Sequence, residues 1–388
     1  MGTDPALVIF SALYPPHAGG VEMYTQSLAR ALVRSGRRTI VVTMALGADS
    51  GWSEESDIEV LRLPCRPLLG GRYPVPHRDE SYRKSWSWLE SQAVCGVVVN
   101  TRFYLLSCDG LRFAKDHHVV PVLIEHGSAH LTMGSPVLDA GVQFVEHTLT
   151  VRCKRFPADY YAVSAKASAW LSHFGIASCG ELSNAIDADE FCHCASNRDF
   201  RAELDLDEHD LLVAFVGRLV KEKGIESLAE ACSAARANGC LVSVVAAGTG
   251  PLEDALRNGS EKGFYCVGGL ARPDVAALLQ QADVLCLPSR SEGFATALLE
   301  SAACGTAFIA TDVGGARELA TDPSHGTIIP DAEPNTVTEA LMHAARHRDE
   351  LASQGAKLAR VVREERTWDA TATDVIAACE RANGSALR

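Results

Sequence analysis

Short apolar segments alternate with amphipathic segments along the first half of the chain. A helical pattern covers residues 21–35, and the apolar runs cover residues 6–13, 38–44, 58–63, 95–100, 119–125 and 159–164. Continuous apolar runs are typical of strands that are buried on both faces, and the helices between them form the crossovers. The pattern therefore predicts an α/β domain with a parallel sheet that is covered by helices on both sides.

The second half of the chain repeats this organisation. Its apolar runs cover residues 211–217, 240–248, 263–269, 283–288 and 306–312, and residues 187–208 before them are polar and acidic without clear periodicity. We expect two doubly wound, Rossmann-like domains, residues 1–186 and 187–367, that face each other across a cleft. A helix in residues 368–388 is expected to pack back toward the first domain. Ligands of such sheets bind beyond the carboxyl ends of the strands.

The length, net charge and cysteine content of the chain exclude some classes of function. A chain of 388 residues with 47% apolar positions exceeds one ordinary core, and the formal net charge of −13 argues against a nucleic-acid partner. The 13 cysteines are scattered through apolar segments, which is typical of a reducing cytosol. The first residues lack the features of a signal peptide, so a cytoplasmic protein is expected. Small basic stretches at residues 33–38 and 151–156 indicate either ordinary surface charge or peripheral contact with the inner face of the cell membrane.

Glycine and basic residues follow two of the predicted strands. Gly19 and Gly20 precede the helix of residues 21–35, so their amides could approach an anion, or they could simply form a tight turn. Arg218 and Lys223 follow the strand of residues 211–217. A guanidinium and an ammonium at the end of a strand suit a diphosphate, although a solvated charged turn is the simpler interpretation.

Two further loops are more ambiguous. His126 ends an apolar run, which directs its imidazole toward the expected cleft, although a lone histidine is more often structural. The segment AAGTGPLEDAL, residues 246–256, contains only a fragment of a dinucleotide fingerprint. We interpret it as a close-packed turn with Pro251 at the start of a helix.

The segment SRSEGFATALLESAACG, residues 289–305, carries Glu292 and Glu300 in an apolar setting. Buried carboxylates are costly unless they have partners. A helix that begins just after Glu292 would direct its first amides toward a phosphate, and Glu300 could then meet a ribose. The alternative is an acid at a helix start and a second acid that is paired with a structural arginine.

These segments together resemble the retaining glycosyltransferases of family 4, which have the two-domain GT-B fold. The resemblance rests on PPHAGGVEMYTQSLARAL, EHG, VGRLVKEKG, AGTGPLEDAL and SRSEGFATALLE, and the last of these contains an E-x7-E signature at Glu292 and Glu300. It implies catalytic roles for His126, near the transferred sugar and the acceptor, for Arg218 and Lys223, on the leaving diphosphate, and for Glu292, on the hydroxyls of the sugar.

The resemblance also implies a donor-binding set. Glu300 would accept from the ribose, Leu270 would lie by the base, and Gly20 would close over the diphosphate from the first domain. The whole set is Gly20, Gly217, Arg218, Lys223, Leu270, Glu292, Gly293, Phe294, Ala295, Thr296, Ala297 and Glu300.

The expected activity is retaining transfer of a hexose or N-acetylhexosamine from a nucleotide-diphosphate sugar, with UDP favoured, to a hydroxyl acceptor. Polysaccharide, glycolipid or glycosylated-metabolite synthesis would use such an enzyme. The alternatives are a GT-B sugar-nucleotide epimerase and a non-catalytic nucleotide-binding protein. We expect no metal and no further cofactor, because Asp205 and Asp207 imitate a metal-binding DxD motif but lie in the acidic linker, not after a strand.

Overall fold

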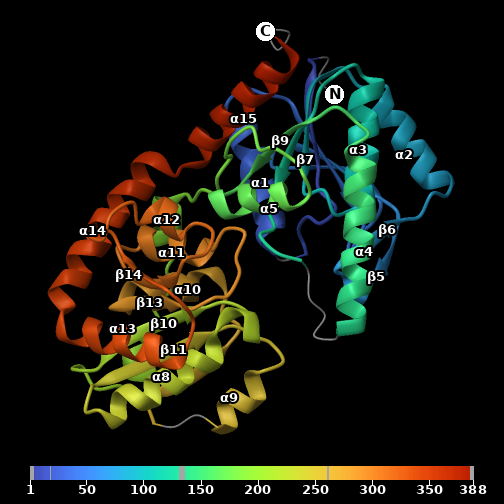
Figure 1. The fold of residues 1–388 in the computed structure, drawn as a ribbon. Helices are drawn as coiled ribbons and strands as arrows, with labels where there is room; N and C mark the ends of the chain where they lie inside the picture. Colours follow the sequence, from blue (N-terminus) through green and yellow to red (C-terminus); the bar gives the residue numbers. More distant parts are fainter. Residues whose placement is uncertain (1–3, 18, 131–135, 260–261, 385–388) are drawn as a thin grey trace. The chain divides into compact units, whose positions relative to one another are not determined.

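The computed structural model describes residues 4–17, 19–130, 136–259 and 262–384 (Figure 1). The chain forms two compact units. Unit 1 comprises Met1–Asn184 and Trp368–Arg388, and unit 2 comprises Ala185–Thr367. The chain thus leaves unit 1 after Asn184 and returns to it at Trp368.

Unit 1 is built on a sheet whose described strands run in the order β3-β4-β2-β1-β7-β8-β9. All neighbouring pairs are parallel except β3 and β4. The buried residues of β1 fill the centre of this sheet. The strands are β1 (Ala6–Phe10), β2 (Thr39–Met44), β3 (Gly51–Glu55), β4 (Ile58–Leu63), β7 (Val94–Asn100), β8 (Val122–Glu125) and β9 (Asp159–Ala162), and a separate hairpin joins β5 (Cys65–Leu68) and β6 (Tyr73–Pro76).

The helices of unit 1 cover this sheet, and its last helix comes from the end of the chain. They are α1 (Gly20–Arg34), the 3₁₀ turn η1 (Leu69–Gly71), α2 (Glu80–Glu90), α3 (Leu105–Asp116), α4 (Pro136–Cys153), α5 (Ala165–His173) and α15 (Trp368–Asn383). Helix α15 packs beside α1 (Figure 1). The hydroxyl of Thr371 donates to the carbonyl oxygen of Ser183 over 3.3 Å, and the side chain of Asn383 accepts from the amide of Val120 at 2.6 Å. These bonds attach both ends of α15 to the rest of unit 1.

Unit 2 contains a second parallel sheet, with its described strands in the order β12-β11-β10-β13-β14-β15. The strands are β10 (Leu211–Val216), β11 (Val242–Ala247), β12 (Phe264–Gly268), β13 (Val284–Leu287), β14 (Ala307–Thr311) and β15 (Thr327–Ile329). Strand β11 is buried throughout, as are β13 and β14. Burial of each large apolar side chain in such strands contributes about 1.5–3 kcal/mol to folding.

The segment that the sequence indicated as an irregular linker is folded into unit 2. It forms α6 (Ala188–His193) and α7 (Phe200–Glu203), which bury Phe191 and Phe200. The sequence does not predict these short helices, because each buries only one large apolar side chain and therefore shows no helical period. The other helical segments of unit 2 are η2 (Lys221–Lys223), α8 (Ile225–Ala237), α9 (Glu253–Gly259), α10 (Arg272–Gln281), α11 (Thr296–Ala303), α12 (Ala316–Leu319), α13 (Pro334–Arg346) and α14 (Arg348–Glu365).

Every apolar run named in the sequence analysis coincides with a strand of one of the two sheets. The additional strands are those with weak patterns. Strand β3 alternates between partly buried and exposed positions, and β15 has only three residues. Such short edge strands take their conformation from the neighbouring strand, which a local hydrophobic pattern does not report.

Candidate active site

The strand order of unit 2 reverses between β10 and β13, and the loops that follow these two strands are packed against each other. The amide of Arg290 donates to the carbonyl oxygen of Glu222 over 2.8 Å. Gly224 has a φ of 68°, and a Cβ there would lie 2.0 Å from the carbonyl oxygen of Pro288. Only glycine allows both this backbone conformation and this approach. The reversal point is the usual ligand crevice of a doubly wound sheet.

Two of the predicted site residues meet at this reversal point. The ammonium of Lys223, from the β10 loop, contacts the Oε1 atom of Glu292, from the β13 loop. The hydroxyl of Ser289 donates to the same oxygen over 2.9 Å. The side chains of Lys223 and Glu292 are 19% and 10% exposed, so a ligand can reach the pair although it is largely desolvated.

The loops after β10 and β12 lie at the same sheet edge, with the loop after β11 between them, and they carry Gly217, Arg218 and Leu270. Arg218 is exposed directly after β10, and Leu270 is partly exposed after β12. A Cβ on Gly248 would lie 1.8 Å from the carbonyl oxygen of Gly217, so the loop of residues 248–252 is close-packed against the β10 loop as predicted. The following helix α9 begins at Glu253, so the expectation that Pro251 starts it is wrong.

The helix in the E-x7-E segment starts later than the sequence indicated. Helix α11 begins at Thr296, and not just after Glu292, because two backbone bonds hold the preceding residues as a loop. The amide of Ala295 donates to Gly314 over 2.9 Å, and the amide of Gly314 donates to Glu292 over 3.3 Å. No side chain caps α11. The first amides of a helix have no carbonyl partner within it, which leaves those of Thr296 and Ala297 available to an anion.

Phe294 and Gly293 complete this loop. Phe294 is 8% exposed, and its ring lies against Gly315. Gly293 is partly buried between Glu292 and this anchor. The buried ring therefore fixes the path of the backbone from residue 292 to residue 295.

Glu300 lies inside α11 and is partly buried. Burial raises the pKa of its carboxyl group to about 7, and the nearby charge of Arg272 lowers it only in part. Arg272 instead donates to Glu190 at 2.5 Å. Among the described residues, no hydrogen bond or salt bridge joins Glu300 to an arginine, although the charge of Arg272 acts on it from nearby.

Unit 1 has the same reversal of strand order, between β1 and β7. Gly20, in the loop after β1, is exposed as the first residue of α1, and a Cβ there would meet nothing within 4 Å. The carboxylate of Glu22 is buried in the same helical turn, with its Oε1 atom 2.6 Å from Nδ1 of His17. The start of α1 thus already holds a negative charge of its own.

His126 directly follows β8 and is fixed by its neighbours. Its Nε2 atom lies 3.0 Å from Oδ1 of Asn100, whose side-chain amide donates to Thr25 over 2.7 Å. The ring of Tyr24 packs edge-on at 4.7 Å. Burial lowers the pKa of His126 to about 3. The imidazole is therefore neutral at physiological pH, with Nε2 as a donor to Asn100 and with the lone pair on Nδ1.

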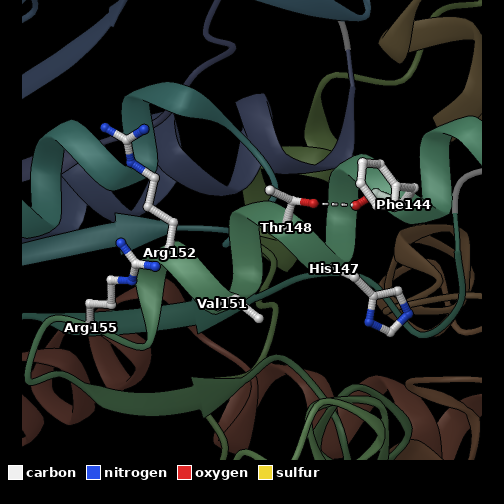
Figure 2. A pocket seen from close by; sticks show the side chains of 6 residues that line it. All are labelled: Phe144, His147, Thr148, Val151, Arg152 and Arg155. Atoms are coloured by element: carbon white, nitrogen blue, oxygen red, sulfur yellow. Dashed lines mark hydrogen bonds between the residues drawn. The ribbon is translucent and has the colours of Figure 1, made fainter.

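A groove of about 470 Å³ runs along α4 in unit 1 (Figure 2). Phe144, His147, Thr148, Val151, Arg152 and Arg155 line it. The groove includes two arginines of the basic stretch at residues 151–156. Phe144 is 73% exposed and Val151 is 57% exposed, so this surface combines apolar and cationic groups. None of the residues that were singled out as catalytic or donor-binding lies here.

A comparison with known families matches residues 196–360 to the family described as "Glycosyl transferases group 1". The matched segment contains the loops after β10, β11, β12 and β13, and therefore all the unit 2 residues of the predicted donor site.

Curated relatives point to the same class of enzyme. A D-inositol 3-phosphate glycosyltransferase from Jonesia denitrificans is 35% identical over 113 residues, which are 28% of this chain and 26% of that protein. One of the same name from Geodermatophilus obscurus is 24% identical over 402 residues, with 96% and 87% covered. The alignment at 35% identity thus spans only about a quarter of the Jonesia denitrificans protein.

Solved structures match nearly the full chain. Sucrose-phosphate synthase from Thermosynechococcus elongatus aligns with a TM-score of 0.77 at 19% identity, covering 97% of this chain and 99% of that one. HepE from Anabaena in complex with UDP-glucose aligns with a TM-score of 0.70 at 16% identity, covering 97% and 99%. The chain has the GT-B fold. With the family match, this likeness supports a GT-B glycosyltransferase.

Some features of this GT-B protein were not singled out from the sequence. Ser289 and Asn100 contact predicted site residues, and both follow or end a buried strand as an isolated polar residue. A single polar residue at the end of a buried strand is the sequence feature that could have identified both. None of the helices that the structure describes is both long enough and apolar enough to cross a membrane.

Proposed function

We propose that this protein is a retaining family 4 glycosyltransferase that moves a hexose or N-acetylhexosamine from a nucleotide-diphosphate sugar to a hydroxyl acceptor. The observation that carries the proposal is the meeting of Lys223 and Glu292 at the reversal point of unit 2, at the same sheet edge as Arg218 and the uncapped start of α11. A cation, a carboxylate and free amides at one sheet edge match the parts of a sugar diphosphate.

The ion pair of Lys223 and Glu292 prepares both groups for the donor. In the free protein each neutralises the other, so neither is left as an unpaired, largely buried charge. When the donor binds, Lys223 would transfer its contact to the diphosphate and Glu292 would accept from a hydroxyl of the sugar. Ser289 remains as a donor that holds the carboxylate in place.

In the proposed reaction the bond between the anomeric carbon and the diphosphate oxygen breaks. The acceptor oxygen bonds to the same carbon on the same face of the sugar. The acceptor proton passes to an oxygen of the leaving diphosphate. Arg218 and Lys223 stabilise the negative charge that develops on the diphosphate, and such preorganised charges commonly contribute a few kcal/mol to lowering a barrier.

In this scheme His126 acts as a neutral imidazole. A neutral imidazole whose Nε2 is occupied by Asn100 offers only an acceptor at Nδ1 and an apolar ring. We propose that it receives a hydroxyl of the transferred sugar. Gly20 is proposed to approach the diphosphate, because its exposed backbone carries no side chain that could obstruct a ligand.

We propose UDP as the nucleotide and no metal in the transfer step. The likeness to a structure that contains UDP-glucose supports UDP at the level of the fold. Arg218 and Lys223 would supply at the diphosphate the positive charge that a metal ion provides in other enzymes. Asp205 and Asp207 are exposed between α7 and the start of β10, so they do not follow the carboxyl end of a strand.

The acceptor side is proposed to involve the membrane surface. Phe144 and Val151 are exposed on α4 beside Arg152 and Arg155, a combination that favours peripheral binding to an anionic bilayer. A cytoplasmic enzyme at the inner face of the cell membrane would thereby reach a lipid-linked acceptor.

The decisive experiment combines a donor panel with calorimetry. Purified protein is incubated with UDP-, GDP- and ADP-sugars, and the products are identified by mass spectrometry in the presence of cell extract. Arg218→Ala should weaken the binding of UDP by about 10–100-fold, as expected for the loss of a charge-assisted bond. Lys221→Ala is the matched control, because Lys221 is an exposed cation on the same loop.

The same assay separates the alternatives. An epimerase would change the sugar of the free nucleotide without any acceptor. A non-catalytic protein would bind UDP and neither hydrolyse nor transfer from any donor. Unchanged UDP affinity in the Arg218 variant would refute the donor-site assignment.

A further inference from the structure

Three histidines that are distant in sequence meet in unit 1. His130 lies in the loop after β8, His147 on α4 and His173 at the end of α5. One nitrogen of each lies within 4.8 Å of those of the other two, and the ring centroids are separated by 5.4–5.6 Å. His147 and His173 are exposed, so core packing does not explain why these rings converge.

His130 is held in the form that binds metal ions. Its Nδ1 atom lies 2.6 Å from Oε2 of Glu146, so it donates to that carboxylate and leaves the lone pair on Nε2. Glu146 is buried, and its other oxygen accepts from Arg102 at 2.6 Å. A carboxylate behind a histidine is the usual arrangement at metal sites, because it fixes the tautomer and makes the ring more basic.

Aromatic side chains restrict the other two rings. Trp170 stacks on His173 with a centroid separation of 4.8 Å and an interplanar angle of 4°. Phe174 packs against His147 at 4.9 Å, and its own ring lies 3.9 Å from the guanidinium of Arg102. These aromatic contacts therefore keep the rings close together before any ligand binds.

The buried charges directly behind His130 suit a cation, and the ammonium of Lys154 lies on another side of the cluster, 2.9 Å from the carbonyl oxygen of Phe174. Arg102 is buried between Glu125 and Glu146 and contacts both. The two carboxylates outnumber the single guanidinium by one, so these groups leave a net negative charge behind His130. A divalent ion on the imidazoles would compensate that charge.

We propose that His130, His147 and His173 bind one divalent transition-metal ion of the zinc class, with a fourth position open to water. Imidazole is a preferred ligand of such ions, and three histidines with one open position are a known coordination set. Zinc–nitrogen bonds of about 2.0–2.1 Å require nitrogens that are about 3.4 Å apart, so the exposed rings of His147 and His173 would turn toward His130 when the ion binds.

The ion would connect the loop after β8, α4 and α5, and would thus stabilise the surface that carries the α4 groove. The site is separate from the proposed transfer chemistry, because none of its ligands belongs to the donor-binding set. The expectation of a metal-free transfer step is therefore unaffected.

The test uses the full chain after removal of metals with a chelator. Calorimetry with Zn²⁺ should give one ion per chain, and Co²⁺ should give the visible absorption of a four-coordinate site without a thiolate charge-transfer band. In the double variant His147→Ala/His173→Ala the affinity should fall by at least about 100-fold. Because both side chains are exposed and contact only the surface of Trp170 and Phe174, the metal-free melting temperature of this variant should fall only slightly.

A second histidine pair provides the control. His343 and His347 stack at 4.1 Å in unit 2, so His343→Ala/His347→Ala removes the same number of imidazoles elsewhere. This variant should bind Zn²⁺ like the wild type, and Zn²⁺ should raise the melting temperature of both. Equal Zn²⁺ affinity in wild type and His147→Ala/His173→Ala, or an equal loss in both double variants, would overturn the proposal.

Discussion

Lys223 and Glu292 form an ion pair although 69 positions separate them in the chain. Their contact joins the loop after β10 to the loop after β13, at the point where the strand order of unit 2 reverses. The pair is largely desolvated. In the proposed mechanism Lys223 contacts the diphosphate and Glu292 contacts the sugar.

Removal of Lys223 should destabilise the free protein. Lys223→Ala leaves the carboxylate of Glu292 largely buried without its cation, at a cost of about 1–3 kcal/mol in the free energy of unfolding. The double variant Lys223→Ala/Glu292→Gln should recover part of that loss. Denaturant unfolding of the two single variants and the double variant gives the coupling energy, with Lys221→Ala as the control. Strict additivity of the two substitutions would contradict an energetic role of the pair.

Glu300 should make the stability of the protein depend on pH. Its pKa is about 7 in the folded protein against an ordinary 4.5, so the folded state binds more protons and stability falls as pH rises from 4.5 through 7. Glu300→Gln removes this penalty and should raise the free energy of unfolding at pH 8 by about 1–3 kcal/mol, with much less effect at pH 5.

Glu300→Gln should also change the pH dependence of UDP binding, which is measured separately from stability. A carboxylate accepts from ribose hydroxyls best when it is ionised, so UDP affinity of the wild type should rise between pH 6 and pH 8. Glu300→Gln should flatten this rise and weaken binding. Calorimetry at both pH values measures it, and an identical pH dependence in the variant would exclude Glu300 as the ribose contact.

His126 should remain neutral throughout the working pH range. Burial lowers its pKa to about 3 from the ordinary 6.5, so its ring resonances should not titrate between pH 5 and pH 8 in an NMR experiment. His126→Ala should reduce transfer by about 10–100-fold, as expected for the loss of one hydrogen bond to the sugar. A titration of His126 near pH 6.5 would contradict the neutral role.

Two glycines should respond differently to alanine. Gly224→Ala combines a left-handed backbone with a 2.0 Å approach to Pro288, and should cost about 3 kcal/mol or more in the free energy of unfolding. Gly20→Ala meets open space at the start of α1 and should leave the melting temperature unchanged. Thermal unfolding measures both. Normal transfer activity in Gly20→Ala would argue against the proposed approach of this residue to the diphosphate.

The apolar and cationic surface of α4 should bind anionic vesicles. Phe144→Glu/Val151→Glu replaces two exposed apolar side chains, so sedimentation with phosphatidylglycerol vesicles should fall several-fold while UDP binding persists. Met23→Glu is a matched control, because Met23 is an exposed apolar side chain of unit 1 on α1. Equal sedimentation of all three proteins would refute membrane contact through α4.

Much of the fold could be predicted from the sequence because it depends on local patterns. Buried strands such as β11 and β14 are nearly uniform apolar runs, and α1 follows its helical period to within a residue of the expected bounds. Strand β3 and the helix α7 lacked such a signal, because their conformation depends on a neighbouring strand and on one buried phenylalanine.

The start of α11 shows why a pattern is not sufficient for a site. The apolar period extends back toward Glu292, but backbone bonds to Gly314 delay the helix until Thr296. A partner from another part of the chain decides that boundary, and it thereby decides which amides are free.

The sequence by itself determined the two α/β units and the residue types that their loops present, because apolar periodicity and loop chemistry are properties of short segments. Only the tertiary structure decided which of these residues meet. The contact of Lys223 with Glu292, the neutral state of His126 and the convergence of His130, His147 and His173 all depend on burial and on distances between remote segments. Those quantities exist only after the sheets have assembled.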